Sequence, residues 1–484
     1  MTASLQDAFA RPTQRRGSRR LILWTTGVVL LTAAALVACS MLLVRRSDQI
    51  PDIGEPFDVE TFAAYTLPNE QNAISQYLLA QRALVPLDQS LVKPHSGRIE
   101  DTARREALLD WRQANDAERK WLEANRTTLE IWKRGTTRDE AIEVPFDRLS
   151  VTSLLPAATD VRRFVSLALL EASRQAAEGR AADAWSWYLA ALRASRHFCM
   201  HAGGVERLVG IRMYSVARDP ILNWSSRPEL TAGDLRQALS DVLNVDGMTP
   251  PLSDTFKTEY ISERNGLSEI LANLPEHQPW AAVETRFSGR PERMRRALKL
   301  FFANWIAHAD RPRAGRRPLP DKDIPLFEVD SPGEPPLPAP AALKSAVAMW
   351  LTGLGAHGST AVVPPLDFAL PGLTYLFDAA DRDQMNRAAV IVGLALQLYF
   401  REHRSVPPTL AELVKAGYLK SIPLDPFGKG EPIHYRVEGN PPREIVWSVG
   451  LDGVNEAGKP SVVNGDERST DDTVFELAAP RKMH

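Results

Sequence analysis

Cysteine is scarce in this chain of 484 residues, which contains only two, Cys39 and Cys199. Because Cys39 lies inside a long apolar run, Cys199 has no partner in the rest of the chain, and an intrachain disulfide is excluded there. An excess of basic residues is also missing, since 58 Lys and Arg are balanced by 60 Asp and Glu. The net charge of −2 provides no electrostatic footprint for nucleic acid, so we expect no nucleic-acid partner.

Recognisable catalytic motifs are absent as well: we find no nucleophile elbow, Walker loop, kinase signature or β-lactamase triplet. Gly353, Gly355 and Gly358 have the spacing of a dinucleotide loop, but no strand precedes them. His197 and His201 have a spacing that metal sites use, but a bare pair falls short of a tetrahedral ligand set. We interpret the pair as a polar helix surface, and we predict no catalytic or cofactor-binding residues. A triad assembled in space would leave no local pattern, so an unrecognised site stays open.

An uncharged apolar run, Leu21–Val44, dominates the N-terminal region. A helix needs roughly 20 apolar residues to cross the hydrocarbon core of a membrane, so the run predicts a single transmembrane helix. A cleaved signal peptide is one alternative, although its apolar core is usually shorter. A lipoprotein anchored at Cys39 is another, because Leu36–Cys39 resembles a lipobox. Further apolar residues and two arginines follow Cys39, as at a stop-transfer end, and favour the uncleaved anchor.

Flanking charge predicts the orientation of this anchor. Arginines near a membrane span tend to stay in the cytoplasm. They are more numerous before the run, at Arg11, Arg15, Arg16, Arg19 and Arg20, than after it, at Arg45 and Arg46. We therefore expect a single-pass protein of a bacterial cell membrane, with a cytoplasmic N-terminus and an extracytoplasmic bulk.

The remaining chain predicts a mainly α fold with a small C-terminal α+β module. Composition and periodicity divide it into a cytoplasmic tail (1–20), the transmembrane helix (21–44), a linker (45–60), a helical domain (61–310), a Pro-rich linker (311–340), connecting helices (341–382), the α+β module (383–478) and a tail (479–484). The Pro-rich segment lacks the apolar content of a core.

The clearest local pattern in the helical domain is the hairpin Val161–Phe198, in which apolar residues recur at helical spacing on both sides of Gly179. Gly179, Ala184, Tyr188 and Ala191-Leu192 resemble the second half of a tetratricopeptide unit. Further helices are predicted at 205–217, 235–243, 255–271 and 293–306, with Pro220, Pro228, Pro250 and Pro251 between them. We interpret Trp111, Trp121 and Trp132 as helix-packing residues.

In the C-terminal module we expect a helix at 384–402, a short helix at 410–416 and two antiparallel strands near 433–437 and 444–450. The pieces LALQLYF, VPPTLAELV, YLKSIPLDPFGKGEPIHYRV and SVGLDG, followed by Asp471-Asp472, resemble the soluble domain of the major pseudopilin of type II secretion. The apolar run has neither the cleaved leader nor the Glu of that family. The resemblance therefore implies a fold and a bound calcium ion rather than assembly into a filament.

Calcium is the one cofactor that this resemblance implies. In the pseudopilin family the loop after the last strands holds the ion, and the matching acids here are Asp452 and Asp472, with Asn455 and Asp471 as helpers. Calcium takes six to eight oxygen ligands, which such a loop can supply. The spacing is not that of an EF-hand, and an acidic solvated loop is the alternative interpretation.

These observations predict a non-enzymatic, membrane-anchored extracytoplasmic interaction or scaffold protein. Its expected partners are the membrane and an unidentified envelope protein. One alternative is a component of a type II secretion or pilus-like machine, and another is an exported hydrolase with an unrecognised site.

Overall fold

A computed structural model describes parts of 24–35 and residues 52–87, 107–277, 290–316, 365–439, 442–458 and 472–476. Its contacts divide the chain into two compact units. The first unit comprises Met1–Ile53, Glu269–Ala297 and Ala341–Val362, and the second comprises Gly54–Ser268, Leu298–Pro340 and Val363–His484. Several predictions fall outside the described residues: the tails 1–20 and 479–484, most of the Pro-rich linker, the segment 341–364 with its glycine motif, and Asp471.

In the first unit, the described part of the predicted membrane span is helical. Its large apolar side chains are exposed, at 76% for Trp24, 51% for Val28, 65% for Leu30 and 72% for Leu31. Considering all described residues, we find no helix that is both long and apolar enough to cross a membrane. Most of Leu21–Val44 lies outside the described residues, so the membrane span stays a prediction.

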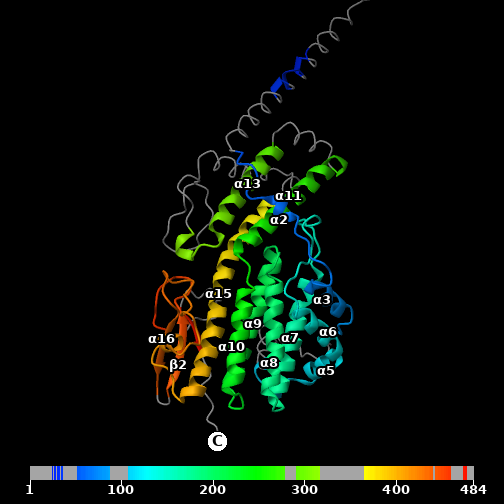
Figure 1. Ribbon diagram of the computed structural model, residues 1–484. Coiled ribbons are helices and arrows are strands. Elements are labelled where there is room, and N and C mark those ends of the chain that lie inside the picture. The colour runs from blue at the N-terminus through cyan, green and yellow to red at the C-terminus, as the bar shows by residue number, and fades with distance from the viewer. Residues whose placement is uncertain are drawn as a thin grey trace, which may run out of the picture. The chain divides into compact units, whose positions relative to one another are not determined.

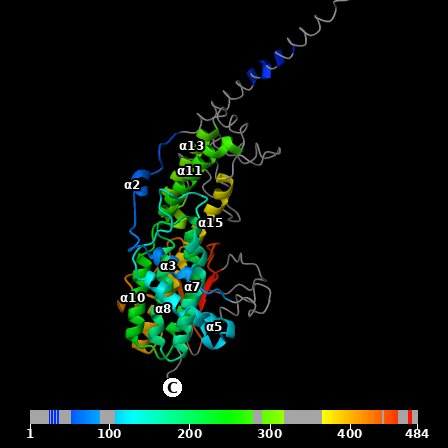
Figure 2. The same ribbon diagram turned by 90° about the vertical axis from the view of Figure 1, so that its right-hand side faces the viewer.

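The second unit begins with α2 (Val59–Ala63), and a layer of short helices follows, which faces the viewer in Figure 2. Polar side chains accept hydrogen bonds from the first free N–H groups of several of these helices, as expected at helix starts. Asp58, Asn72 and Asn115 do so for α2, α3 and α5. The layer comprises α3 (Ala73–Arg82), the 3-10 turn η2 (Trp111–Gln113), α5 (Asp116–Ala124) and α6 (Arg126–Thr136).

Four longer helices form the centre of the second unit: α7 (Pro156–Ala177), α8 (Ala181–His197), α9 (Gly204–Ser225) and α10 (Ala232–Gly247). The predicted hairpin corresponds to α7 and α8, which turn at Gly179 with a φ of +83°. Trp132 of α6 is fully buried and stacks on Phe164 of α7, so its interpretation as a packing residue is confirmed. Thr231 caps α10 together with Asp234.

Pro220 corrects one prediction, because it lies inside α9 and not between helices. The helix continues to Ser225, eight residues beyond the predicted end at Ala217. An interior proline removes one backbone hydrogen bond and disfavours a helix. Pro220 and the following Ile221 are buried, and α9 packs against both α8 and α15. Tertiary packing therefore outweighs the local cost of the proline.

Two further helices, α11 (Leu252–His277) and α13 (Arg290–Ala309), have residues in both units. In their second-unit portions the rings of Phe256 and Trp305 lie 5.7 Å apart, and those of Tyr260 and Phe302 lie 5.6 Å apart. A short 3-10 turn, η3 (Arg313–Gly315), follows α13. These aromatic pairs extend the buried core along α11.

The C-terminal region is organised by α15 (Pro365–His403), which crosses the predicted module boundary at 383. In Figure 1 this helix lies between α9 and α10 on one side and the sheet on the other, together with α16 (Ala411–Lys415). From Ala388 to Leu398 nearly every apolar side chain of α15 is buried. The broad apolar stripe predicted at 384–402 is therefore covered on more than one side.

The sheet has three antiparallel strands in the order β1-β2-β3, namely β1 (His434–Glu438), β2 (Arg443–Ser448) and β3 (Thr473–Glu476). Tyr435 faces Val446 across the first pair, and Val446 faces Phe475 across the second. The first two strands match the predicted hairpin. The third was not predicted, because a four-residue strand far along the chain carries too little alternation to be recognised. The mainly helical fold with a small C-terminal sheet is thus confirmed.

Candidate functional sites

The predicted calcium residues lie in the segment between β2 and β3. Asp452 is exposed, and its Oδ1 accepts a hydrogen bond from the N–H of Val454 at 3.0 Å. The side-chain oxygen of Asn455 accepts from the Trp447 indole at 3.0 Å and from the Ala457 N–H at 2.9 Å. Both lone-pair positions of Asn455 are thus engaged in folding the loop, which makes this side chain a poor metal ligand.

Asp472 lies beside a residue that the sequence interpretation missed, Glu456. One Asp472 oxygen accepts the Gly458 N–H at 2.6 Å, while Oδ1 is buried without a hydrogen-bond partner, and so is Oε2 of Glu456. Burial, the charge of Asp452 and the adjacent Asp472 together raise the pKa of Glu456. A buried carboxylate oxygen without a partner is unusual and calls for a proton or a cation.

The donor set of this loop suits a hard cation, because carboxylate oxygens are the ligands that calcium prefers. Asp452 and Asp472 both act electrostatically on Glu456, and carboxylate oxygens of Glu456 and Asp472 are buried. Within the described ranges, however, no three His, Cys, Asp or Glu side chains are grouped so that they could hold a metal ion. Asp471, the fourth predicted residue, lies outside those ranges.

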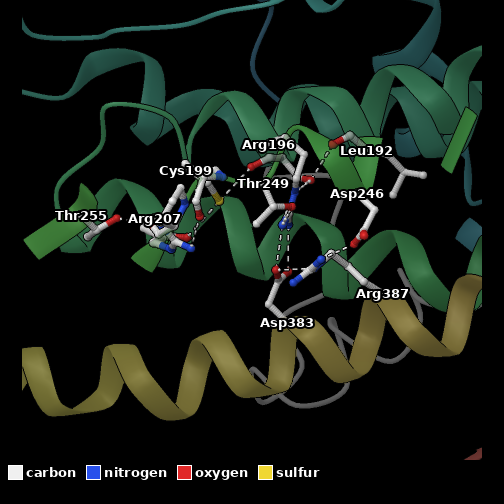
Figure 3. A network of polar contacts seen from close by, with 12 residues as sticks. Leu192, Arg196, Cys199, Arg207, Asp246, Thr249, Thr255, Asp383 and Arg387 are labelled. Atoms are coloured by element: carbon white, nitrogen blue, oxygen red, sulfur yellow. Dashed lines mark hydrogen bonds and ion pairs between the residues drawn. The ribbon is translucent and has the colours of Figure 1, made fainter. Parts of the chain in front are cut away.

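A buried ion-pair network joins three helices that are distant in sequence (Figure 3). Arg196 of α8 is fully buried, and both terminal nitrogens of its guanidinium donate to the Asp383 carboxylate of α15 at 2.7 and 2.8 Å. Arg387, one turn further along α15, donates to Asp383 at 3.0 Å and also pairs with Asp246 of α10. The network therefore connects α8, α10 and α15.

Electrostatics keep this network charged although it is buried. Burial alone would raise the pKa of Asp383, but Arg196 and Arg387 hold it below its ordinary value. Burial likewise opposes the charge on Arg196, while Asp383 holds the pKa of that guanidinium above its ordinary value. A bidentate Arg–carboxylate pair offers the geometry that a buried ion pair needs to offset desolvation. We assign the network a structural role in holding α15 on the helical body.

The two histidines of the sequence motif do not lie together on a polar helix surface, which corrects that interpretation. His197 ends α8 and is buried, with Nδ1 2.6 Å from the Tyr77 hydroxyl and Nε2 2.9 Å from the Arg138 carbonyl. His201 lies beyond the helix with a φ of +49° and stacks on Tyr65. Cys199, between them, is buried, and burial raises the pKa of its thiol.

Apolar side chains are exposed at the end of the helical body where α7 and α9 begin. These two helices run parallel, because α8 reverses the chain between them. Val151 and Leu154, before α7, are 44% and 86% exposed, and Val205, in the first turn of α9, is 63% exposed. We call these three residues the apolar end surface. Exposed apolar residues indicate an interaction site where they form a contiguous patch.

One hollow in the helical body is lined by Tyr77, Trp132, Phe164 and Phe198, but it has no room for a water molecule. Comparisons of the chain with protein-family models, with curated proteins and with solved structures find no match. The resemblances to a tetratricopeptide unit and to a pseudopilin therefore stay predictions. Function has to be argued from the described residues themselves.

Proposed function

We propose that this chain is a non-enzymatic interaction or scaffold protein, anchored in a bacterial cell membrane with its bulk outside the cytoplasm. The exposed apolar side chains of Trp24, Val28, Leu30 and Leu31 support the anchor, because such a helix needs a lipid or protein environment to cover it. The arginine-rich N-terminal flank supports the orientation.

The single observation that carries the interaction role is the apolar end surface. Leu154 exposes 86% of its area, although the body beneath it is closely packed. The ion-pair network holds α15 on the helical body, which suits a scaffold. A partner with a complementary apolar surface is therefore the class of ligand that we propose.

Crosslinking in intact membranes followed by purification tests this role. We expect Leu154→Glu and Val205→Glu to reduce recovery of the crosslinked partner by tenfold or so, because a buried charge weakens an apolar contact. Leu243→Glu on α10 is the matched control, since Leu243 is 42% exposed on another helix and its replacement should leave recovery unchanged. Equal recovery for all three variants would contradict the proposed surface.

A second candidate, a component of a type II secretion or pilus-like machine, is favoured by the element order of the C-terminal region. A long helix, α15, precedes a short helix and a small antiparallel sheet, which is the order that the pseudopilin resemblance implies. The same crosslinking experiment separates the two candidates. Secretion-channel subunits among the recovered proteins would favour the second, and a good yield without them favours the first.

We also propose that the loop between β2 and β3 binds calcium through Asp452 and Asp472, with Glu456 as an additional carboxylate. Asp471 belongs to the same proposal from its place in the sequence. The buried carboxylate oxygens of Asp472 and Glu456, which lie side by side, support it. A bound calcium ion would supply positive charge that neutralises these acids.

A further inference from the structure

Four buried or half-buried glutamates lie near the starts of α7 and α9, two of them contributed by α11. Glu143, in the segment before α7, accepts the N–H groups of Ala157 and Ala158 at 2.6 and 3.2 Å. Glu206 accepts the Gly203 N–H at 2.8 Å, and Glu259 of α11 accepts the N–H of Gly204. Glu263 follows Glu259 by one helical turn on α11. We call Glu143, Glu206, Glu259 and Glu263 the glutamate cluster.

The first three members bond to the free N–H groups at the starts of α7 and α9, where negative charge is favourable. The fourth member has no such role. Glu263 is 5% exposed, and its Oε2 is buried without any hydrogen-bond partner. An ionised carboxylate in that position would be costly, so Glu263 indicates that the cluster takes up something positive.

Charges that act on the cluster come from its own members. Glu206 is influenced by Glu143 and Glu259, and Glu263 by Glu259. The basic residues Arg207 and Lys257 on the same helices are engaged elsewhere, with the carbonyls of Pro250 and Pro251 and with the Asp254 carboxylate.

Further charged groups nearby do not supply the missing positive charge. Glu140, in the segment before α7, and Asp254, in the first turn of α11, are also acids, and both act on His201. Burial lowers the pKa of His201, which disfavours its charged form. On α13, whose Phe302 packs against Tyr260, Lys299 pairs with Glu55 at 3.8 Å. Among the described residues, the charges that act on Glu206 and Glu263 are thus carboxylates of the cluster itself.

We propose that the glutamate cluster is a proton-binding site that holds α11 against α9 while its carboxyls are protonated and loosens this contact when they ionise. The link between the two helices there is made by side chains, since Glu206 and Glu259 both lie against Gly203 and Glu259 accepts the Gly204 N–H. Protonation removes the repulsion between the carboxyls, whereas ionisation places like charges side by side in a buried space.

The direction of the pH dependence follows from the shifted carboxyls. Burial, the first cause in each case, raises the pKa of Glu143 to about 7 and those of Glu206 and Glu263 to about 8, and it also raises the pKa of Glu259. An unfolded chain would ionise these groups near pH 4.5. Stability from the cluster is therefore fully present in acid and is lost as the pH rises through about 7 to 8.

Thermal unfolding of the full-length chain in detergent, followed by tryptophan fluorescence with a chelator present, tests the proposal. We expect the wild-type midpoint to fall by about 5 °C or more between about pH 5.5 and pH 8.5. Glu206→Gln with Glu263→Gln mimics the protonated state and should at least halve that fall. Glu70→Gln, at an exposed position, is the control and should leave it unchanged.

A second measurement follows α11 directly. Amide hydrogen exchange at about pH 8 should be slower in α11 for the double variant than for the wild type, because the helix stays docked. If the double variant fails to fold, Glu263→Gln alone replaces it, since Glu263 Oε2 has no hydrogen bond to lose.

Two outcomes would overturn the proposal. One is an identical pH dependence in the wild type and the glutamine variants. The other is a midpoint at about pH 8 that Mg²⁺ or Ca²⁺ raises in the wild type but not in the double variant, which would make the ligand a metal cation and not a proton.

Discussion

Asp383 is the residue on which the buried ion-pair network depends. Replacing it by Asn leaves the fully buried Arg196 without a charged partner, so we expect Asp383→Asn to lower the free energy of unfolding by roughly 3–5 kcal/mol. Asp110→Asn is the matched control, because the Asp110–Arg112 pair is exposed and should contribute about 0–1 kcal/mol. Urea unfolding measures both, and similar losses would show that the network contributes no special stability.

His197 should make the protein sensitive to acid. Burial, the dominant cause, lowers its pKa from 6.5 to about 3, so the folded chain binds fewer protons there than the unfolded chain. The contribution of the neutral histidine to the free energy of unfolding is complete above about pH 6.5. It is lost as the pH falls toward 3, by up to about 1.4 kcal/mol per pH unit.

Urea unfolding of His197→Gln tests the direction of this pH dependence of stability. Relative to the wild type, the variant should gain stability steadily as the pH is lowered from about 6 to about 4, because its side chain takes up no proton. The exposed His403→Gln should follow the wild type. A constant difference between His197→Gln and the wild type across this range would mean that His197 is not buried in its neutral form.

Among the elements, α8 and α9 approach each other closely at Gly210, which has no side chain to hold them apart. A Cβ on Gly210 would lie 2.4 Å from the Ser195 carbonyl oxygen and 2.8 Å from the Cys199 sulfur. Gly210→Ala should therefore force the helices apart and cost roughly 1–3 kcal/mol. Gly247→Ala in α10 meets no atom within 4 Å and should instead add about 0.5–1 kcal/mol. Thermal melting distinguishes the two, and equal effects would contradict the close approach.

The loop between β2 and β3 carries the calcium proposal. At a hundredfold excess over the dissociation constant, calcium binding to the folded state alone would add about 2.7 kcal/mol. We expect a higher unfolding midpoint with calcium than with chelator, and no such difference in Asp452→Ala with Asp472→Ala. A calcium effect that survives in this double variant, or an unchanged wild-type midpoint, would exclude the site.

At the scale of the whole molecule, the proposed topology predicts where the C-terminus lies. A reporter that is active only in the cytoplasm should be silent when fused after His484, because the N-terminal arginines retain the other end inside. A fusion to residue 20 is the control and should be active. An active C-terminal fusion would reverse the orientation, and a mature N-terminus with a diacyl group at Cys39 would establish the lipoprotein alternative.

Local patterns in the sequence were sufficient to predict several of the helices. Apolar spacing around Gly179 predicted the α7–α8 hairpin, and the broad apolar stripe of 384–402 predicted a helix covered on several sides. Each of these signals is complete within a few helical turns, so it can be recognised without knowing what lies next to it.

Tertiary structure decided the features that depend on juxtaposed elements. Arg196 and Asp383 are 187 positions apart. The sequence around each of them does not distinguish it from a charged residue on the surface. The glutamate cluster draws on three separate segments, Glu456 meets Asp472 only when the loop closes, and Pro220 stays helical only because α8 and α15 pack on α9. The burial of a side chain and its pairing with a charge depend on the residues that surround it. Folding brings these residues together from distant parts of the chain.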